Sequence, residues 1–171
     1  LLMNLLTDGL PALALGFDPP TRDIMLQSPR GTKEGAISKD TWIFSIFVGL
    51  SIMVSTLLLF WMYLDNGLNY ARTIAFSTIV VAQMFNVFNS RDDKSIFENP
   101  SALFNNKLLL LALLMSVLLQ ILVVHVGIVG QYFGTVPLSL ADWGFVVLAG
   151  SLVLFVIETK KKFRIKTAET Q

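Results

Sequence analysis

Three oxygen-bearing side chains stand close together near the start of the chain, in the string LLMNLLTDGLPALALGFDPP. Asn4, Thr7 and Asp8 are spaced so that they share one face if this segment is helical. Their amide, hydroxyl and carboxylate oxygens could then converge on one point. Hard cations such as Ca²⁺ take about six to eight oxygen ligands, often including backbone carbonyls. Gly9 and Pro11 would loosen the helix beside these side chains and free such carbonyls.

The same side chains allow a second interpretation. Asp8 could cap a helix or lie near a membrane interface, while Asn4 and Thr7 only hold helices together. On the other hand, a broken helix beside a buried carboxylate is how transporters build ion sites near the middle of the membrane. Ionisable side chains within membrane segments are also functional in most cases. The spacing alone leaves both interpretations open.

Composition places the chain in a membrane. Of its 171 residues, 54% are hydrophobic and 15% are charged, against about 45–50% and about 25% in average soluble domains. Cysteine is absent, which excludes disulfide bonds and thiolate metal sites within this sequence. The net charge is +1, and nothing in the sequence suggests a nucleic-acid partner.

Apolar segments predict an all-α bundle of about five transmembrane helices, because a helix of about 20 apolar residues crosses a hydrocarbon core. The first helix is short, and we expect it to be truncated and broken near Gly9–Pro11. The uncharged stretch after residue 107 is too long for one helix, and GIVGQYFGTVPLS contains the glycines and proline that divide it. The predicted helices are residues 1–17, 42–64, 73–90, 108–129 and 138–157.

The third predicted helix differs from the others because it carries the amide side chains of Gln83, Asn86 and Asn89. Amides facing lipid are costly, so these side chains should face protein or a cation. For Asn86 and Asn89, both a ligand role and simple hydrogen bonding between helices remain open. His125, alone in LQILVVHVGIV, is either a proton relay or a hydrogen-bonded packing residue.

The basic residues predict the orientation of the bundle. Apart from Arg72, every Lys and Arg lies in residues 18–41, in residues 91–107, or after the last predicted helix. In a bundle of five helices these three segments share one side, which the positive-inside rule assigns to the cytoplasm. The loops 18–41 and 91–107 and the C-terminus are therefore predicted to be cytoplasmic. The sequence does not predict which membrane holds the protein.

Two strings resemble one family of ion pumps. NLLTDGLPALALGFDPP resembles the sixth transmembrane helix of P-type (type II) Ca²⁺-transporting ATPases, where Asn-x-x-Thr-Asp-Gly-x-Pro is followed by Gly-Phe and Pro-Pro. QMFNVFNSR is similar to the eighth helix of these pumps. The order of helices and loops matches helices six to ten, so the resemblance identifies residues 1–171 as the C-terminal part of the transmembrane domain. Sodium–potassium pumps typically have Asp-Met-Val-Pro here, which makes the Ca²⁺ branch the nearer relative.

The resemblance implies a set of metal ligands. Asn4, Thr7 and Asp8 fall on the three positions of the sixth helix that bind Ca²⁺ in the family, where the carboxylate is shared between two ion sites. Gln83 stands where the eighth helix of two-site animal pumps has a Glu. A neutral amide would hold a second Ca²⁺ less well than a carboxylate. We therefore expect Gln83 to be a weaker ligand and the parent pump to carry one Ca²⁺ per cycle.

The resemblance also shows which parts of such a pump this sequence does not contain. The phosphorylated Asp-Lys-Thr-Gly-Thr motif, the nucleotide-binding and actuator domains, and the fourth helix with Pro-Glu-Gly-Leu-Pro are not among these residues; nor is the fifth helix. The chain alone is expected to have no catalytic residues, no cofactor-binding residues and only half of a Ca²⁺ site. ATP and Mg²⁺ would bind in cytoplasmic domains outside this sequence, and we expect it to be an excised fragment or one part of a longer pump.

The implied partners are the remaining helices and cytoplasmic domains of the same pump, together with the lipid bilayer. Three other functions remain as alternatives: a purely structural helical support domain, a P-type pump for another cation, and a stand-alone secondary transporter or channel. The shared face of Asn4, Thr7 and Asp8 favours an ion pump over a pure support. A secondary transporter would often show an inverted repeat or a second broken helix, and the sequence shows neither.

Overall fold

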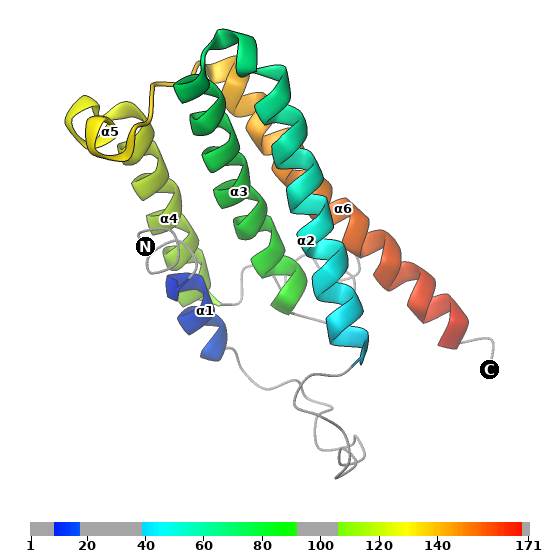
Figure 1. The fold of residues 1–171 in the computed structure, drawn as a ribbon. Coiled ribbons are helices and arrows are strands. Elements are labelled where there is room, and N and C mark those ends of the chain that lie inside the picture. The colour runs from blue at the N-terminus through cyan, green and yellow to red at the C-terminus, as the bar shows by residue number, and fades with distance from the viewer. Residues whose placement is uncertain (1–8, 18–38, 92–105, 169–171) are drawn as a thin grey trace.

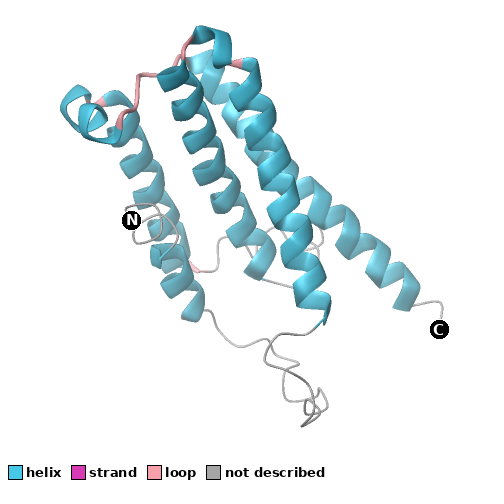
Figure 2. Cartoon of the chain, in the orientation of Figure 1, coloured by secondary structure: helices cyan, strands magenta, loops and turns pink. Residues whose placement is uncertain are grey.

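The computed structural model describes residues 9–17, 39–91 and 106–168 (Figure 1). Every regular element among these residues is a helix, and short loops connect them at one end of the bundle (Figure 2). The predicted all-α fold is confirmed. The elements are α1 (Gly9–Gly16), α2 (Lys39–Met62), η3 (Leu64–Asn66), α3 (Leu68–Arg91), α4 (Lys107–His125), α5 (Gly127–Phe133) and α6 (Leu140–Ala168).

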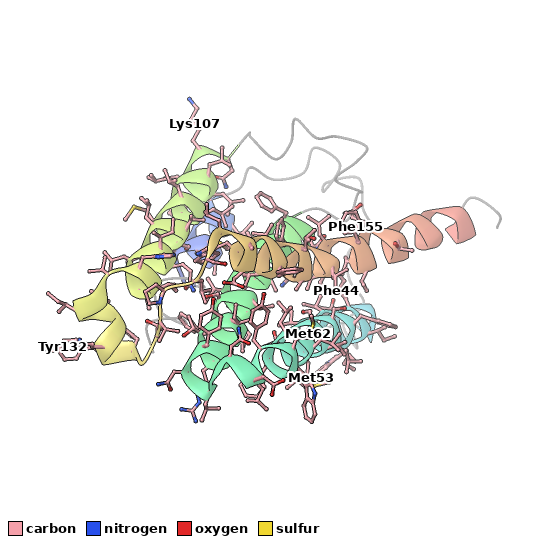
Figure 3. The ribbon with its side chains drawn as sticks, turned by 90° about the horizontal axis from the view of Figure 1, so that it is seen from above. Phe44, Met53, Met62, Lys107, Tyr132 and Phe155 are labelled. Carbon is pink, nitrogen blue, oxygen red and sulfur yellow. The ribbon has the colours of Figure 1, made fainter. Side chains whose placement is uncertain are left out.

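Four of these helices are long and apolar enough to cross a membrane, within α2, α3, α4 and α6. Many large apolar side chains on these helices face outward, as lipid-facing residues do. Figure 3 shows Phe155 on α6 and Tyr132 on α5 pointing away from the bundle. The predicted membrane bundle is therefore confirmed. The candidate spans are Thr41–Met62, Leu68–Ser90, Lys107–His125 and Leu140–Thr159.

The first predicted helix, residues 1–17, falls partly outside the described residues. Its described part, α1, is a continuous helix of eight residues that begins at Gly9. Pro11 lies in the first turn of α1, where a missing N–H group breaks no hydrogen bond of the described helix. The predicted break near Gly9–Pro11 concerns the residues before Gly9 as well, and it stays a prediction.

The other helix bounds differ from the predicted ones for local reasons. α3 begins at Leu68 rather than at residue 73, because η3 and Gly67, which has a φ of 107°, complete the turn after α2. α4 ends at His125 rather than at residue 129, and the glycine-containing segment after it forms the separate helix α5. α6 continues past residue 157 to Ala168, because Glu, Lys and Arg are good helix formers.

The helices pack in two groups. α2, α3 and α6 lie against one another, and Val48, Ala82 and Val153 are buried between them. α1 lies against α4, where Ala14 and Ala112 belong to a second apolar cluster. Figure 1 shows α3 between α4 on one side and α2 and α6 on the other. We call the end of the bundle that contains η3 and α5 the η3 end.

The closest approach between α3 and α6 depends on Gly150. A Cβ atom at this position would lie 2.8 Å from Val81 Cγ1 and 3.1 Å from the Ala82 backbone nitrogen. Glycine therefore lets the two helices approach more closely than any other residue would. The contact of Gly150 with Val81 and Ala82 therefore sets the distance between α3 and α6.

We expect Gly150→Ala to destabilise the full-length protein by about 1–3 kcal/mol, because the added methyl group forces α3 and α6 apart. Thermal unfolding in detergent measures the change. Gly144→Ala is the matched control, since Gly144 lies on the same helix with open space around its Cβ position. That control should be neutral or slightly stabilising, because alanine favours helix over glycine. Equal stability of the two variants would show that the close approach is not required.

Candidate functional site

The metal ligands predicted on the first helix are Asn4, Thr7 and Asp8, and all three lie outside the described residues. Their roles stay predictions. Gly9, the residue after Asp8, begins α1. α1 is held against α4 at its other end, because the Asn106 side chain donates a hydrogen bond from Nδ2 to the Ala14 carbonyl oxygen at 3.0 Å. The side-chain oxygen of Asn106 also caps α4 by accepting from the Leu109 N–H at 2.9 Å.

The fourth predicted ligand, Gln83, is described and lies on a polar face of α3. At about 100° per residue, Gln83 and Asn86 fall on one side of the helix, while Met84 and Phe88 fall on the other. The Asn86 side-chain oxygen is buried and has no hydrogen-bond partner in the part of the chain that the structure describes. A buried amide oxygen without a partner is costly, and amide oxygens are neutral ligands for hard cations. This face of α3 can therefore contribute oxygen ligands from within the membrane.

No group of three or more His, Cys, Asp or Glu side chains comes together in residues 9–17, 39–91 and 106–168. The described residues therefore offer neutral oxygens on α3 rather than a cluster of charged ligands. The carboxylate that the sequence predicts for the site, Asp8, belongs to the undescribed segment. The structure thus brings Gln83 and Asn86 onto one face and leaves the position of Asp8 untested.

A buried carboxylate that the sequence analysis missed lies at the η3 end. Asp142 is 7% exposed, and its side chain accepts hydrogen bonds from the Tyr70 hydroxyl, from the Ser139 N–H at 2.9 Å and from the Ser139 hydroxyl at 2.5 Å. The Asp142 N–H in turn donates to the Ser139 hydroxyl at 3.2 Å, which completes a reciprocal cap at the start of α6. The Ser-x-x-Asp spacing before an apolar run was a signal for this cap, but it did not indicate Tyr70.

Tyr63 belongs to the same cluster. Its ring stacks on that of Tyr70, with centroids 5.9 Å apart. Burial, followed by a hydrogen bond to Asp142, raises the pKa of Tyr63 to about 12. Tyr63 therefore stays protonated across the physiological range and can act as a donor to the carboxylate. Together, Tyr63, Tyr70, Ser139 and Asp142 join the α2–α3 connection to the start of α6, and we call them the Asp142 cluster.

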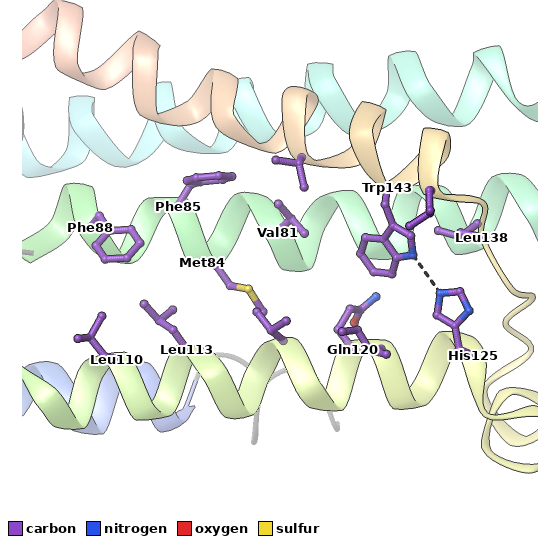
Figure 4. A pocket seen from close by; sticks show the side chains of 14 residues that line it. Val81, Met84, Phe85, Phe88, Leu110, Leu113, Gln120, His125, Leu138 and Trp143 are labelled. Carbon is purple, nitrogen blue, oxygen red and sulfur yellow. Dashed lines mark hydrogen bonds between the residues drawn. The ribbon is translucent and has the colours of Figure 1, made fainter. Parts of the chain in front are cut away.

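His125 also has its partner at the η3 end. The Trp143 ring N–H donates to His125 Nε2 at 3.0 Å, and the two rings are 6.2 Å apart (Figure 4). This contact joins the end of α4 to the start of α6. A second hydrogen bond joins α4 to α3: the Gln120 side-chain N–H donates to the Ser77 hydroxyl at 2.9 Å. The hydrogen bond to Trp143 supports the packing interpretation of His125.

Comparison with known proteins identifies the family of the chain. Residues 1–163 match the family model described as "Cation transporting ATPase, C-terminus". The chain belongs to this family. A calcium-transporting ATPase of Bacillus subtilis (strain 168) is 38% identical over 168 residues, which are 94% of this chain and 18% of that protein. The calcium-transporting ATPase type 2C member 1 of Homo sapiens is 32% identical over 163 residues, again 94% of this chain and 18% of the relative.

The cation-transporting ATPase segment therefore spans about 18% of the length of these relatives. The resemblance to a P-type Ca²⁺-transporting ATPase, which the sequence suggested from two short strings, is confirmed over nearly the whole chain. The matched range, residues 1–163, contains the positions of Asn4, Thr7, Asp8 and Gln83. It assigns no role to individual residues, so the ligand set remains a proposal.

Proposed function

We propose that this segment forms part of the intramembrane Ca²⁺ site of an ATP-driven Ca²⁺ pump, together with the helices that support the site. The observation that carries the proposal is the sequence similarity to calcium-transporting ATPases, which extends over 94% of the chain. The buried amide face of α3 supports it, because the Asn86 oxygen has no hydrogen-bond partner among the described residues and is suited to a ligand role.

In this proposal the charged ligand is Asp8, with Asn4 and Thr7 on the same helix face and Gln83 contributing a neutral oxygen from α3. A Ca²⁺ ion that leaves water needs about six to eight oxygens and at least some negative charge. The four side chains are too few to complete this shell. The remaining ligands come from other helices of the same pump, which are the expected partners of this segment along with the bilayer.

The helix ends support the proposed orientation of the segment. α2 and α4 begin, and α3 and α6 end, at the end of the bundle opposite η3 (Figure 1). In the sequence, the basic residues of segments 18–41 and 91–107 and of the C-terminus come at or beyond these helix ends, whereas Arg72 lies near the η3 end. We assign the basic end to the cytoplasm. ATP and Mg²⁺ would act there, in domains outside this chain.

The stoichiometry that we propose is one Ca²⁺ per cycle, and it rests on Gln83. Two dications a few ångströms apart repel each other, and each carboxylate that is lost makes that repulsion harder to offset in a medium of low dielectric constant. In the full-length protein we expect a ratio of bound radioactive calcium to phosphorylatable sites near one. Gln83→Glu should raise this ratio, because it restores a charged ligand on α3.

A wild-type ratio near two would contradict the proposed stoichiometry. Gln120→Glu provides a matched control, because the same change is made on α4, where the Gln120 side chain is bound to Ser77. This control should leave the ratio at one. If Gln83→Glu also leaves it at one, the stoichiometry holds but Gln83 does not determine it. Absence of any Ca²⁺-dependent phosphorylation by ATP in the wild type would contradict the pump function itself.

A purely structural support role is the second candidate, and the Asp142 cluster favours it for the η3 end. Its four residues tie the start of α6 to the α2–α3 connection through hydrogen bonds. Such a network fixes helices in place through hydrogen bonds. The two roles are compatible within one chain, since the support lies at the η3 end, whereas Gln83 lies farther along α3.

A further inference from the structure

An apolar groove of about 740 Å³ runs between α3, α4 and α6 (Figure 4). Met84, Phe88, Leu113 and Val147 are among the residues that line it. The lining residues with polar groups, Gln120, His125 and Trp143, lie toward the η3 end, where Trp143 reaches from α6 to His125 on α4. The groove is therefore apolar along most of its length and has polar groups at one end. An amphiphile, with an apolar chain and a polar head, has the same distribution of polarity.

The groove lies at the depth of the hydrocarbon core. Except for Leu138, its lining residues belong to the candidate spans of α3, α4 and α6. Along α4 the lining extends from Leu110 to His125, which is about 22 Å at the helical rise. One leaflet contributes roughly half of a core about 30 Å thick. The groove is therefore long enough to accept a whole acyl chain that enters at the η3 end.

The groove and the proposed cation face lie on opposite sides of α3. Met84 and Phe88 line the groove, whereas Gln83 and Asn86 are turned away from it by the helical rotation of about 100° per residue. This step rests on the proposed function: helices that complete a Ca²⁺ site must approach α3 on the Gln83 side. The groove therefore faces away from the side on which those helices approach, and its lining residues lie within the membrane-spanning helices.

The volume of the groove also favours a small occupant. A transmembrane helix is a cylinder about 10 Å wide and 30 Å long, roughly 2,400 Å³, and it is several times larger than the groove. Pockets of about 300–1,000 Å³ hold single small molecules. At the polar end, His125 Nε2 accepts the Trp143 N–H, so the proton of the neutral ring is on Nδ1. That N–H can donate to an ester or phosphate oxygen.

We propose that this groove binds one acyl chain of a bilayer phospholipid, with the glycerol ester region of the lipid beside His125 and Trp143. Lipid tails are as apolar as the groove, so transfer from the bilayer gains little by the hydrophobic effect. Retention depends on close packing along the groove and on the hydrogen bond at its polar end. A lipid held in this way survives washing that removes the lipids at the protein surface.

The test measures phospholipid that remains with the full-length protein after exchange into a delipidating detergent, quantified by mass spectrometry. The wild type should retain about one phospholipid per chain, as a pocket of this size allows. Val117→Phe, which places a ring in the groove, should reduce retention at least about tenfold. Leu118→Phe is the matched control, because Leu118 is exposed on α4 but does not line the groove. It should retain lipid as the wild type does.

Equal retention by the two variants, or none by the wild type, would overturn the proposal. A photoreactive amino acid at Val147, which lines the groove, gives a second measurement that does not depend on the folding of a filled variant. Its crosslink to a phospholipid is the expected product, and a crosslink to another protein segment would show that protein covers the groove. Ca²⁺-dependent phosphorylation of the same preparations tests the proposed function separately. If the protein retains lipid but is not phosphorylated, the result contradicts the proposed pump function and leaves the lipid site supported.

Discussion

Asp8→Asn should abolish Ca²⁺-dependent phosphorylation of the full-length pump by ATP at ordinary Ca²⁺ concentrations. The substitution keeps the shape of the side chain and removes one negative charge. A divalent ion in the membrane must replace its hydration shell with ligands that include charge, and Asp8 is the carboxylate that we assign to this site. Loss of a charged partner of a buried ion costs roughly 3 kcal/mol or more, so the apparent Ca²⁺ affinity should fall at least about a hundredfold.

Phosphoenzyme formation measured across a series of Ca²⁺ concentrations gives this affinity. Asp65→Asn makes the same chemical change in η3, where Asp65 is exposed, and it should leave the affinity unchanged. An unaltered Ca²⁺ dependence in Asp8→Asn would remove Asp8 from the site. Calorimetry on the 171-residue chain alone adds a second check, because half of a ligand set should bind Ca²⁺ only weakly. Micromolar binding by this chain would contradict the need for partner helices.

Asp142→Ala should destabilise the protein by about 2–4 kcal/mol, because it leaves the partly buried Tyr70 hydroxyl without its acceptor and removes the cap at the start of α6. The side chain accepts hydrogen bonds from the Tyr70 hydroxyl and from Ser139, and it caps the start of α6. Loss of a cap alone costs about 0.5–2 kcal/mol. Denaturant unfolding in detergent, followed by a signal from the membrane helices, measures the change.

Asp65→Ala is the control for loss of an exposed Asp near the same end, and it should change stability little. Tyr70→Phe removes one donor, and in the Asp142→Ala background it should cost much less than in the wild type. That non-additivity is the signature of a direct contact between the two side chains. If the effects simply add, or if Asp142→Ala is as mild as Asp65→Ala, the cluster does not hold the η3 end together.

Much of the fold could be predicted because it depends on local composition. Long apolar runs require helices in a bilayer, and this physical constraint predicted the four candidate spans found among the described residues. The ends of the helices were harder, since they depend on turn geometry. Gly67, with its φ of 107°, completes the short turn between α2 and α3, and Gly134, with a φ of 66°, ends α5. A glycine in a sequence signals such a turn without indicating on which side the next helix begins.

The candidate sites also differ in how far the sequence predicts them. Asn4, Thr7 and Asp8 could be grouped because neighbours on one helix follow from spacing. The Asp142 cluster could not, because Tyr70 and Asp142 are 72 residues apart and meet only after α3 and α6 pack. The same holds for His125 and Trp143, whose contact depends on where α4 ends. Contacts between helices require the packing angles, and composition does not contain them.

The short turn between α2 and α3 also bears on how the protein enters the membrane during synthesis. Only Tyr63, η3 and Gly67 separate the two helices, so neither can be placed across the bilayer while the other stays outside. α3 is the less apolar of the two and carries amides that would be exposed to lipid if it inserted alone. At roughly 5–20 residues per second, the ribosome completes the 24 residues of α3 within about 1–5 seconds after α2. We therefore expect α2 to wait at the translocon for α3, so that the two are released into the bilayer as one hairpin.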